Sequence, residues 1–354
     1  MIEEAHGNLL QADVDALVNT VNTVGVMGKG IALQFKRAYP ENFTAYETAC
    51  QLGEVRLGSM FVHRTGQMTR PHYILNFPTK GHWRAKSRLK DVETGLRDLR
   101  RVIETLGIRS VAVPPLGCGN GGLEWNDVRE LIYALLANLP DVRILVYPPE
   151  GAPHARDMIN RTERPKLTRD RAALLLAFAR YVEMSARAAL SLDGKFSLME
   201  AQKVAYFLQS SGWPLRLEFV PSFYGPYCQS LNRFISDAEG HFLTGYGDGT
   251  GGSKATLELH PEAVAEADEL IGSAKEFCET LDRFSALVEG FEFPYGIELL
   301  STVHFVAGQI HGKATTDQVI ASIGAWSSRK RSLFKPAQAT IAFDHLASRQ
   351  AIPV

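Results

Sequence analysis

The sequence predicts an α/β fold for residues 1–150, followed by a mainly helical α+β domain at residues 167–354. In the first part, short apolar runs alternate with segments of helical periodicity, which is typical of a mostly parallel sheet covered by helices. In the second part helical periodicity dominates. Residues 151–166 lie between them and combine prolines and charges without an apolar period, which indicates a linker. A chain of 354 residues is long enough for two such domains.

Five strands are expected in the first domain, because short runs of apolar and β-branched residues bounded by turn residues favour buried strands. They are residues 16–21, 59–62, 73–77, 110–114 and 142–147. Helical periodicity predicts three helices between them, at residues 31–38, 91–106 and 126–138. Open sheets of this kind bind ligands at the loops that follow the carboxyl ends of their strands, so the chemistry is expected there.

Capping signals place the helices of the second domain. Ser197 and Glu200 fit a capping box at the start of a helix that Gly212 ends. Proline favours the first turn of a helix, so residue 261 is expected to open one long helix toward residue 288, and residue 336 the last helix. Residues 215–224 and 256–259 are expected to add a small sheet.

Charge and cysteine content exclude several classes of protein. The formal net charge is −1, so no global basic field attracts nucleic acid or a membrane. The four cysteines are far apart and form no CxxC pair, which argues against a zinc site or a disulfide framework. No metal is expected. The N-terminus lacks the features of a signal peptide and no apolar run is long enough to span a bilayer, so a cytoplasmic protein without a membrane partner is expected.

Two glycine-rich loops each follow a predicted strand and lead into a helix, at residues 25–32 and 114–122. Such a loop presents backbone N–H groups and the positive end of the helix dipole to a phosphate. Two of them are able to hold the two phosphates of one diphosphate, although a glycine loop by itself is more often a tight turn. Gly28-x-Gly30 is not followed by a third glycine, and Gly30 stands where a P-loop needs Ser or Thr, which argues against a dehydrogenase and an NTPase.

A lysine lies in a position suited to nucleophilic chemistry. Lys80 follows the predicted strand at residues 73–77, so it is expected at the carboxyl edge of the sheet beside the glycine loops. Phe77 and Trp83 are apolar neighbours that would desolvate its amine, lower its pKa and make it a usable nucleophile. The alternative is an ordinary solvated lysine.

Several segments resemble the macrodomain family, whose members bind ADP-ribose. They are the Gly-Asn-Leu-Leu at residues 7–10, residues 14–22, the first glycine loop and the Pro-Leu-Gly-Cys-Gly of the second loop. The resemblance covers residues 1–150 and is strongest to macrodomain antitoxins that act on ADP-ribosylated DNA, through residues 19–36, 76–84 and 113–123. In the second half, residues 202–207, 223–227 and 294–300 resemble antitoxin domains of the Panacea type.

The resemblance implies a three-layer macrodomain that works as a DNA ADP-ribosyl glycohydrolase, a hydrolase and DNA-repair enzyme. Its substrate would be ADP-ribosylated single-stranded DNA, with thymidine as the expected modified nucleoside. The residue carried over as catalytic is Lys80, which would attack C1″ of the distal ribose. The second domain would bind and neutralise a cognate DarT-type toxin, the DNA ADP-ribosyltransferase. ADP-ribose is then part of the substrate, and no cofactor is expected.

The same resemblance assigns the substrate-binding residues, with the side chain of Asn22 orienting the distal ribose and loop amides binding the diphosphate. The full set is Asn8, Leu9, Thr20, Asn22, Val26, Met27, Gly28, Gly30, Ile31, Thr79, Leu116, Gly117, Cys118, Gly119, Asn120 and Gly121. Two positions depart from the family pattern. Asn8 stands where many macrodomains have an aspartate that accepts from adenine, and an amide oxygen still can accept. The second loop has Asn120, with Glu124 just beyond, in place of an assisting aspartate.

Two charged stretches suggest further partners. Residues 80–101 are basic, and His82, Trp83 and Arg84 among them are expected to contact the DNA strand by stacking and phosphate contacts. Residues 255–298 hold eleven acidic residues and two basic ones. Such a run is usually a solvated helix face, and the alternative is that it imitates DNA in a groove of the toxin.

Two other functions remain open at this point. One is a non-catalytic reader of ADP-ribose, which has no need of a lysine at the distal ribose. The other is an interaction protein that acts only by sequestering the toxin. Lys80 discriminates between these and the enzyme.

Overall fold

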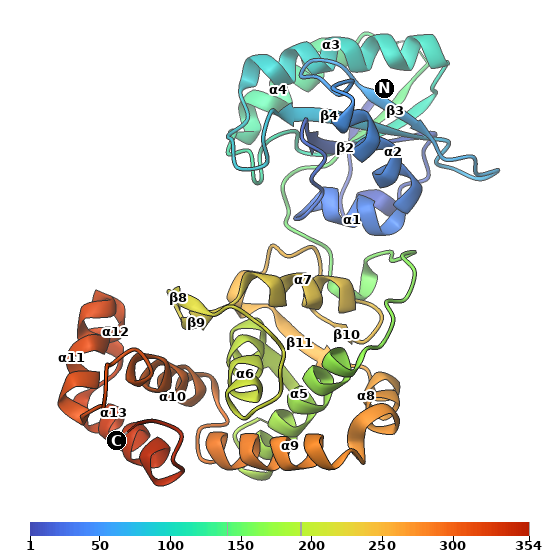
Figure 1. Ribbon diagram of the computed structural model, residues 1–354. Coiled ribbons are helices and arrows are strands. Elements are labelled where there is room, and N and C mark those ends of the chain that lie inside the picture. Colours follow the sequence, from blue (N-terminus) through green and yellow to red (C-terminus); the bar gives the residue numbers. More distant parts are fainter. Residues whose placement is uncertain (140, 192, 354) are drawn as a thin grey trace. The chain divides into compact units, whose positions relative to one another are not determined.

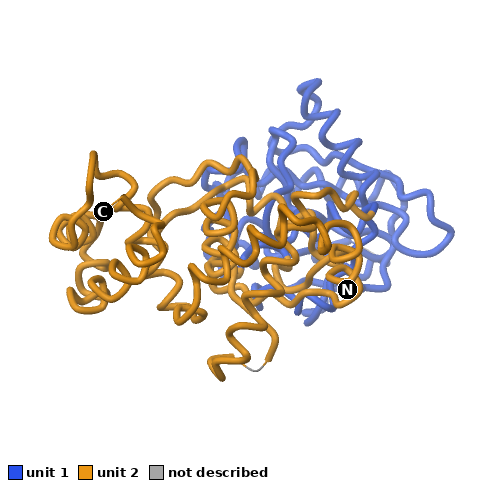
Figure 2. The backbone as a smooth tube through the Cα atoms, turned by 60° about the horizontal axis from the view of Figure 1, so that its bottom comes forward, with its two compact units in different colours: residues 1–163, 248–250 blue, residues 164–247, 251–354 orange. Residues whose placement is uncertain are grey.

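The computed structural model describes residues 1–139, 141–191 and 193–353. The chain forms two compact units (Figure 2). Unit 1 contains Met1–Glu163 together with Asp248–Thr250, and unit 2 contains Arg164–Gly247 together with Gly251–Val354. Residues 151–163 of the expected linker therefore group with unit 1.

Unit 1 is built on a six-stranded sheet with the strand order β1-β6-β5-β2-β4-β3. All neighbouring strands are parallel except β3 and β4, which are antiparallel, so the sheet is mixed and mostly parallel. The strands are β1 (Ile2–Glu4), β2 (Ala16–Asn22), β3 (Phe61–Arg64), β4 (Tyr73–Lys80), β5 (Ser110–Val113) and β6 (Arg143–Val146). This is the predicted fold class.

Helices cover both faces of this sheet, which makes three layers (Figure 1). The helices are α1 (Ile31–Ala38), α2 (Pro40–Gln51), α3 (Leu89–Leu106) and α4 (Trp125–Leu136). Alternate residues of a strand point to opposite faces, so Leu75 and Phe77 of β4 pack with α3 and α4, whereas Ile74 packs with α1. The central strands β2, β4 and β5 are therefore buried on both sides, which explains their continuous apolar runs, whereas the edge strands β1 and β3 are partly exposed.

The predicted strands and helices of unit 1 are present with small shifts at their ends. β4 is longer than expected and ends at Lys80 itself. β1 and α2 were not predicted from the sequence. β1 has only three residues, and two of them are glutamates. α2 carries only three buried side chains in its twelve residues, so its apolar period is weak, although Pro40 at its first position is a helix-start signal.

Unit 2 is mainly helical around one large apolar core, as predicted. Its helices are α5 (Arg169–Arg187), α6 (Leu198–Ser210), α7 (Gln229–Ala238), α8 (Pro261–Ala267), α9 (Lys275–Val288), α10 (Pro294–Ala307), α11 (Thr316–Trp326), α12 (Ser328–Leu333) and α13 (Pro336–Ser348). The capping box that opens α6 is confirmed. The Ser197 hydroxyl accepts from the N–H of Glu200 at 3.2 Å, and the Glu200 carboxylate accepts from the N–H of Ser197 at 2.7 Å.

The prediction of one helix from residue 261 toward residue 288 is wrong. α8 ends at Ala267, a π-helical turn follows at Asp268–Gly272, and α9 begins at Lys275. Glycine is a poor helix former, and Ala274 before α9 has an extended backbone with ψ of 120°, so the chain restarts there. Apolar periodicity continues across the break because Ile271 and Phe277 are both buried.

The small sheets also differ from the expectation of a single sheet. β11 (Thr256–Leu259) pairs with β7 (Lys195–Ser197) and β10 (Leu243–Thr244) in a three-stranded antiparallel sheet. β8 (Val220–Ser222) instead pairs with β9 (Gly225–Tyr227) in a separate hairpin. The two segments expected to share a sheet thus belong to two different sheets.

Candidate active site

Lys80 is the last residue of β4 and lies opposite Asn22, the last residue of β2. The register between these parallel strands shifts between Val21 and Asn22, where the Thr79 hydroxyl donates to the Val21 carbonyl at 3.3 Å. Thr79 is buried. The predicted position of the lysine at the carboxyl edge of the sheet is therefore confirmed.

The amine of Lys80 contacts the second glycine loop. Its Nζ donates to the backbone carbonyl of Asn120 at 3.1 Å. Removal of the half-buried amine from water lowers the pKa of Lys80 below the usual lysine value. The strand that carries the lysine and the loop expected to bind phosphate thus meet at this nitrogen.

Ser87, which was not predicted from the sequence, supports the second glycine loop. The N–H of Ser87 donates to the Gly121 carbonyl at 3.0 Å. The Ser87 hydroxyl is buried and has no hydrogen-bond partner among the described residues. A Cβ on Gly121 would lie 2.3 Å from this hydroxyl oxygen and 2.3 Å from the Gly117 carbonyl oxygen, so residue 121 has to be glycine. No spacing or motif pointed to Ser87.

The loop contributes few side chains of its own. Leu116 is buried in the core between sheet and helices, whereas Gly119 and Asn120 are exposed. Burial raises the pKa of the Cys118 thiol to about 11, and the nearby charge of Glu124 adds to the effect. A neutral thiol is a weak nucleophile, so Cys118 does not compete with Lys80 in this role.

Asn22 organises the first glycine loop. Its amide nitrogen donates to the Val26 carbonyl at 2.6 Å, and its side-chain oxygen accepts from the N–H groups of Val24 at 3.1 Å and Val26 at 3.3 Å. Tyr46 of α2, which sequence reasoning also missed, donates from its hydroxyl to the Asn22 carbonyl at 2.5 Å. In this conformation the amide of Asn22 shapes the loop, and its expected contact with a ribose stays a prediction.

The rest of the first loop leads into α1 with Gly30 as its N-cap. Met27 is buried against Tyr46 and Val55, and Gly28 and Val26 are exposed. Ile31 begins the helix. The predicted arrangement of a glycine loop at a helix N-terminus is confirmed.

Asn8, the residue expected near the adenine, lies at the start of the chain, close in sequence to the expected substrate-binding residue Leu9. Asn8 caps the short 3-10 helix Leu9–Gln11, where its side-chain oxygen accepts from the N–H of Leu10 at 3.0 Å. Leu9 is buried in the core with Leu17 of β2. Thr20 is half-buried in β2. The side-chain oxygen of Asn8 keeps a second lone pair, so an adenine amino group is able to donate to it while the helix cap remains.

The three expected DNA-contact residues form one stack directly after Lys80. The rings of His82 and Trp83 are stacked with centroids 5.4 Å apart, and the guanidinium of Arg84 lies 4.4 Å from the centre of the Trp83 ring. All three are exposed, Trp83 by 45%. An exposed tryptophan with a cation over its ring is suited to stack on a base.

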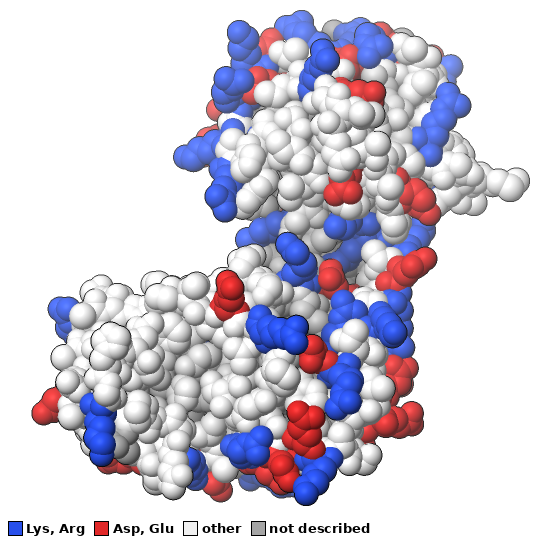
Figure 3. Space-filling view, viewed as in Figure 1, with Lys and Arg blue, Asp and Glu red and all other residues white. Residues whose placement is uncertain are grey.

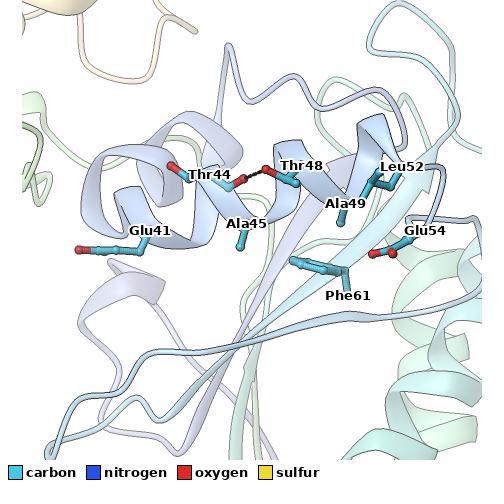
Figure 4. A pocket seen from close by; sticks show the side chains of 8 residues that line it. All are labelled: Glu41, Thr44, Ala45, Thr48, Ala49, Leu52, Glu54 and Phe61. Atoms are coloured by element: carbon cyan, nitrogen blue, oxygen red, sulfur yellow. Dashed lines mark hydrogen bonds between the residues drawn. The ribbon is translucent and has the colours of Figure 1, made fainter.

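A surface depression of about 530 Å³ lies elsewhere on unit 1, between α2 and β3. Figure 4 shows its short apolar and hydroxyl side chains, with a carboxylate at each end. It is lined by Glu41, Thr44, Ala45, Thr48, Ala49, Leu52, Glu54 and Phe61. No expected site residue is among them. In the described parts of the chain, no cluster of His, Cys, Asp and Glu is able to hold a metal, and no helix has the length and apolar composition needed to cross a bilayer.

Comparison with known proteins gives the family. The model of the Macro domain family matches residues 18–132. A DNA ADP-ribosyl glycohydrolase of Thermus aquaticus is 44% identical over 352 residues, which is 99% of this chain and 94% of the relative. A DNA ADP-ribosyl transferase–DNA ADP-ribosyl glycohydrolase fusion protein of Thermosipho africanus is 34% identical over 158 residues, 40% of each chain.

Among solved structures, the macrodomain of Mycobacterium tuberculosis DarG is 62% identical and is covered to 99%, with 42% of this chain matched and a TM-score of 0.42. The identity to the glycohydrolase of Thermus aquaticus extends over nearly the whole of both chains. This chain therefore belongs to the DNA ADP-ribosyl glycohydrolases, a family of hydrolases built on a macrodomain.

Proposed function

We propose that the protein is an antitoxin that removes ADP-ribose from thymidine in single-stranded DNA, with Lys80 as its nucleophile. The observation that carries the proposal is the amine of Lys80, desolvated at the end of β4 and in contact with the second glycine loop. A macrodomain that only reads ADP-ribose gains nothing from an amine with a lowered pKa at this place.

The reaction begins with attack of the neutral Lys80 amine on C1″ of the distal ribose. The N-glycosidic bond breaks, its electron pair leaves with the thymine nitrogen, and this nitrogen takes up a proton. The attacking amine loses a proton and becomes a glycosylamine, which opens to an imine. Water then adds to C1″ and returns the free amine and ADP-ribose.

The residues around Lys80 are suited to bind the diphosphate of ADP-ribose and to orient the lysine amine. The N-terminus of α1 and the backbone of the loop at residues 117–121 are placed to offer N–H groups to the diphosphate. The N–H groups of Gly30 and Cys118 are not among them, because they donate to the carbonyls of Asp248 and Pro115. Asn22 and Tyr46 hold the first loop in the shape that this requires. The Asn120 carbonyl accepts one N–H of Lys80 and leaves the nitrogen lone pair to point elsewhere.

The test is incubation of the protein with a single-stranded oligonucleotide that carries ADP-ribose on thymine, followed by mass spectrometry. The wild type should remove one ADP-ribose, and Lys80→Ala should remove none while still binding free ADP-ribose. Lys313→Ala, which changes an exposed lysine outside the basic stretch at residues 80–101, is the control and should keep full activity. Equal turnover by wild type and Lys80→Ala would refute the lysine mechanism.

A second measurement separates nucleophilic attack from proton donation by the same residue. Sodium cyanoborohydride reduces an imine to a stable amine, so it should attach ADP-ribose covalently to Lys80 during turnover. Peptide mapping locates the adduct. Absence of an adduct during full turnover would leave Lys80 as an acid and not a nucleophile.

The stack of His82, Trp83 and Arg84 supports the DNA part of the proposal. It follows Lys80 by two residues, so a base next to the modified nucleotide is able to stack on Trp83. Trp83→Ala should raise KM for the oligonucleotide and leave the binding of free ADP-ribose unchanged. An equal loss for both ligands would place Trp83 in the ADP-ribose site instead.

We further infer that unit 2 binds a DarT-type toxin, the enzyme that makes the modification. The relative whose name joins a transferase and a glycohydrolase in one chain matches 40% of this chain and supports a toxin partner for the protein as a whole. The choice of unit 2 is based on the resemblance of residues 202–207, 223–227 and 294–300 to antitoxin domains of the Panacea type. The acidic stretch at residues 255–298 is only partly a surface feature, because Glu292 and Glu298 are buried and Glu266 pairs with Arg164 at 2.8 Å. Its imitation of DNA stays a prediction, which charge reversal at Glu262 and Glu269 tests.

A further inference from the structure

The hairpin of β8 and β9 carries large apolar side chains into solvent. At its tip Phe223 is 60% exposed, and Val220 at the start of β8 is 53% exposed. Apolar side chains of this size usually lie inside a protein, so two of them on one short hairpin mark a candidate contact surface. We call Val220, Phe223 and Tyr224 the hairpin tip.

The hairpin tip is braced by α11 and α12. The Arg329 guanidinium lies 4.8 Å from the ring centres of both Phe223 and Tyr224, whose own centroids are 4.8 Å apart. The indole N–H of Trp326 donates to the Ser222 carbonyl at 3.2 Å. An aromatic side chain held in place before binding loses little conformational freedom when a partner covers it.

A buried charge network fixes this brace. Glu298 of α10 accepts from Arg329 at 2.5 and 3.0 Å and from the amine of Lys330 at 2.8 Å. The Lys203 amine donates to the Pro226 carbonyl of β9 at 2.6 Å. Burial lowers the pKa of Lys330 to about 8 and that of Lys203 to about 7. Buried charges are costly, so they indicate that the position of the hairpin is specified and not incidental.

The charge around the hairpin tip indicates what covers it. The cation that contacts the tip, Arg329, is neutralised by Glu298. In the view of Figure 3, much of the surface over α11, α12 and the hairpin is uncharged. The exposed cation of α12, Arg331, donates to the Gly324 carbonyl of α11 and does not contact the hairpin tip in any described interaction. A platform for single-stranded nucleic acid needs free cations along the backbone. The centre of a protein interface is depleted of charge and rich in aromatic residues and arginine, which fits the hairpin tip.

We propose that the hairpin tip is the anchor by which unit 2 binds the DarT-type toxin, with Phe223 inserted into an uncharged apolar pocket of that protein. The proposal rests on the toxin-binding function inferred above and names the surface that performs it. The hairpin tip shares no residue with the acidic stretch at residues 255–298, and it would bind through apolar contacts and not through charge. The contact is apolar, so its strength depends little on salt, whereas a charge-driven contact weakens steeply as salt rises.

The experiment is calorimetric titration of the full chain with the catalytically inactivated toxin of the same pair, at low and high salt. Phe223→Ser should weaken binding by at least about tenfold, because aromatic anchors at the centre of an interface carry much of the affinity. The matched control is Ile341→Ser on α13, which changes a side chain that is 62% exposed and should leave the affinity unchanged. Thermal unfolding of both variants checks that they fold.

Three results would overturn the proposal, each for a different reason. No binding by the wild type removes toxin binding itself. In a second case, Phe223→Ser binds the toxin as tightly as the wild type, and the double variant Glu262→Lys/Glu269→Lys binds it much more weakly. This result would keep toxin binding but assign it to the acidic stretch. Loss of affinity for an unmodified single-stranded oligonucleotide in Phe223→Ser, with unchanged toxin binding, makes the hairpin tip a nucleic-acid contact.

Discussion

The amine nitrogen of Lys80 lies 3.1 Å from the backbone carbonyl oxygen of Asn120. One residue ends a central strand and the other lies at the exposed turn of a glycine loop, forty positions further along the chain. The contact joins the proposed nucleophile to the loop proposed to bind the diphosphate. A substrate held by this loop is thereby placed next to the amine.

The first prediction concerns the pH dependence of the reaction. Burial lowers the pKa of Lys80, and only its neutral form is a nucleophile. The neutral fraction grows as pH rises through this pKa, so kcat/KM for the modified oligonucleotide should rise with pH and level off below the usual lysine pKa of about 10.4. Rates measured by mass spectrometry between about pH 6 and pH 10 test this.

Lys80→Arg is the companion variant, because a guanidinium stays protonated throughout this range. It keeps the positive charge and should be inactive at every pH. A wild-type rate that falls as pH rises would show that the ammonium form acts, as an acid for the leaving base.

The second prediction concerns the close approach inside the second glycine loop. In Gly121→Ala the new Cβ would lie 2.3 Å from the Gly117 carbonyl oxygen, which is backbone and has to move. This displaces Asn120, so kcat/KM should fall by at least about tenfold, a loss of about 1.4 kcal/mol or more of transition-state stabilisation. Gly308→Ala at the end of α10 is the control, because no atom lies closer than 3.5 Å to its Cβ position and it is far from this loop in the sequence. Equal activity of the two variants would show that the loop shape does not matter.

The sequence predicted the sheet well and the site in outline. The strands at residues 73–77 and 110–114 were visible because both of their faces are buried, which makes them continuous apolar runs. The order of the loops followed, since parallel strands end at the same edge of the sheet. Lys80 was placed correctly by this argument alone.

The contacts within the site were not predictable in the same way. The distance between Lys80 and Asn120 depends on how two loops fold over the sheet edge, and no local pattern encodes it. Ser87 supports the loop from below without belonging to any motif. The break at Gly272 between α8 and α9 was hidden because buried residues continue on both sides of it, and glycine inside a helical pattern is often tolerated.

The third prediction concerns the packing of α3 on β4, the strand that ends in Lys80. A Cβ on Gly95 would lie 2.3 Å from Cζ of Phe77, so Gly95→Ala forces the ring or the helix to move. Over-packing should lower the free energy of unfolding by about 1–3 kcal/mol, although alanine favours the helix by about 1 kcal/mol over glycine. Urea unfolding measures the loss. Phe77→Leu removes the ring that the new Cβ meets. In a Phe77→Leu background, Gly95→Ala should therefore cost less free energy of unfolding than it does in the wild type.

The fourth prediction concerns the acid stability of unit 2. The Tyr206 hydroxyl lies 2.6 Å from Nδ1 of His304, and burial lowers the pKa of His304 from 6.5 to about 4. Between these values the unfolded chain binds a proton at this position and the folded chain does not, so stability falls as pH falls from 6.5 toward 4. The loss is on the order of 3 kcal/mol. His304→Gln has no titrating group at this position. As pH falls from 6.5 toward 4, the unfolding free energy of the wild type should therefore fall more than that of the variant. A difference that is independent of pH would mean that the pKa of His304 is the same in the folded and the unfolded chain.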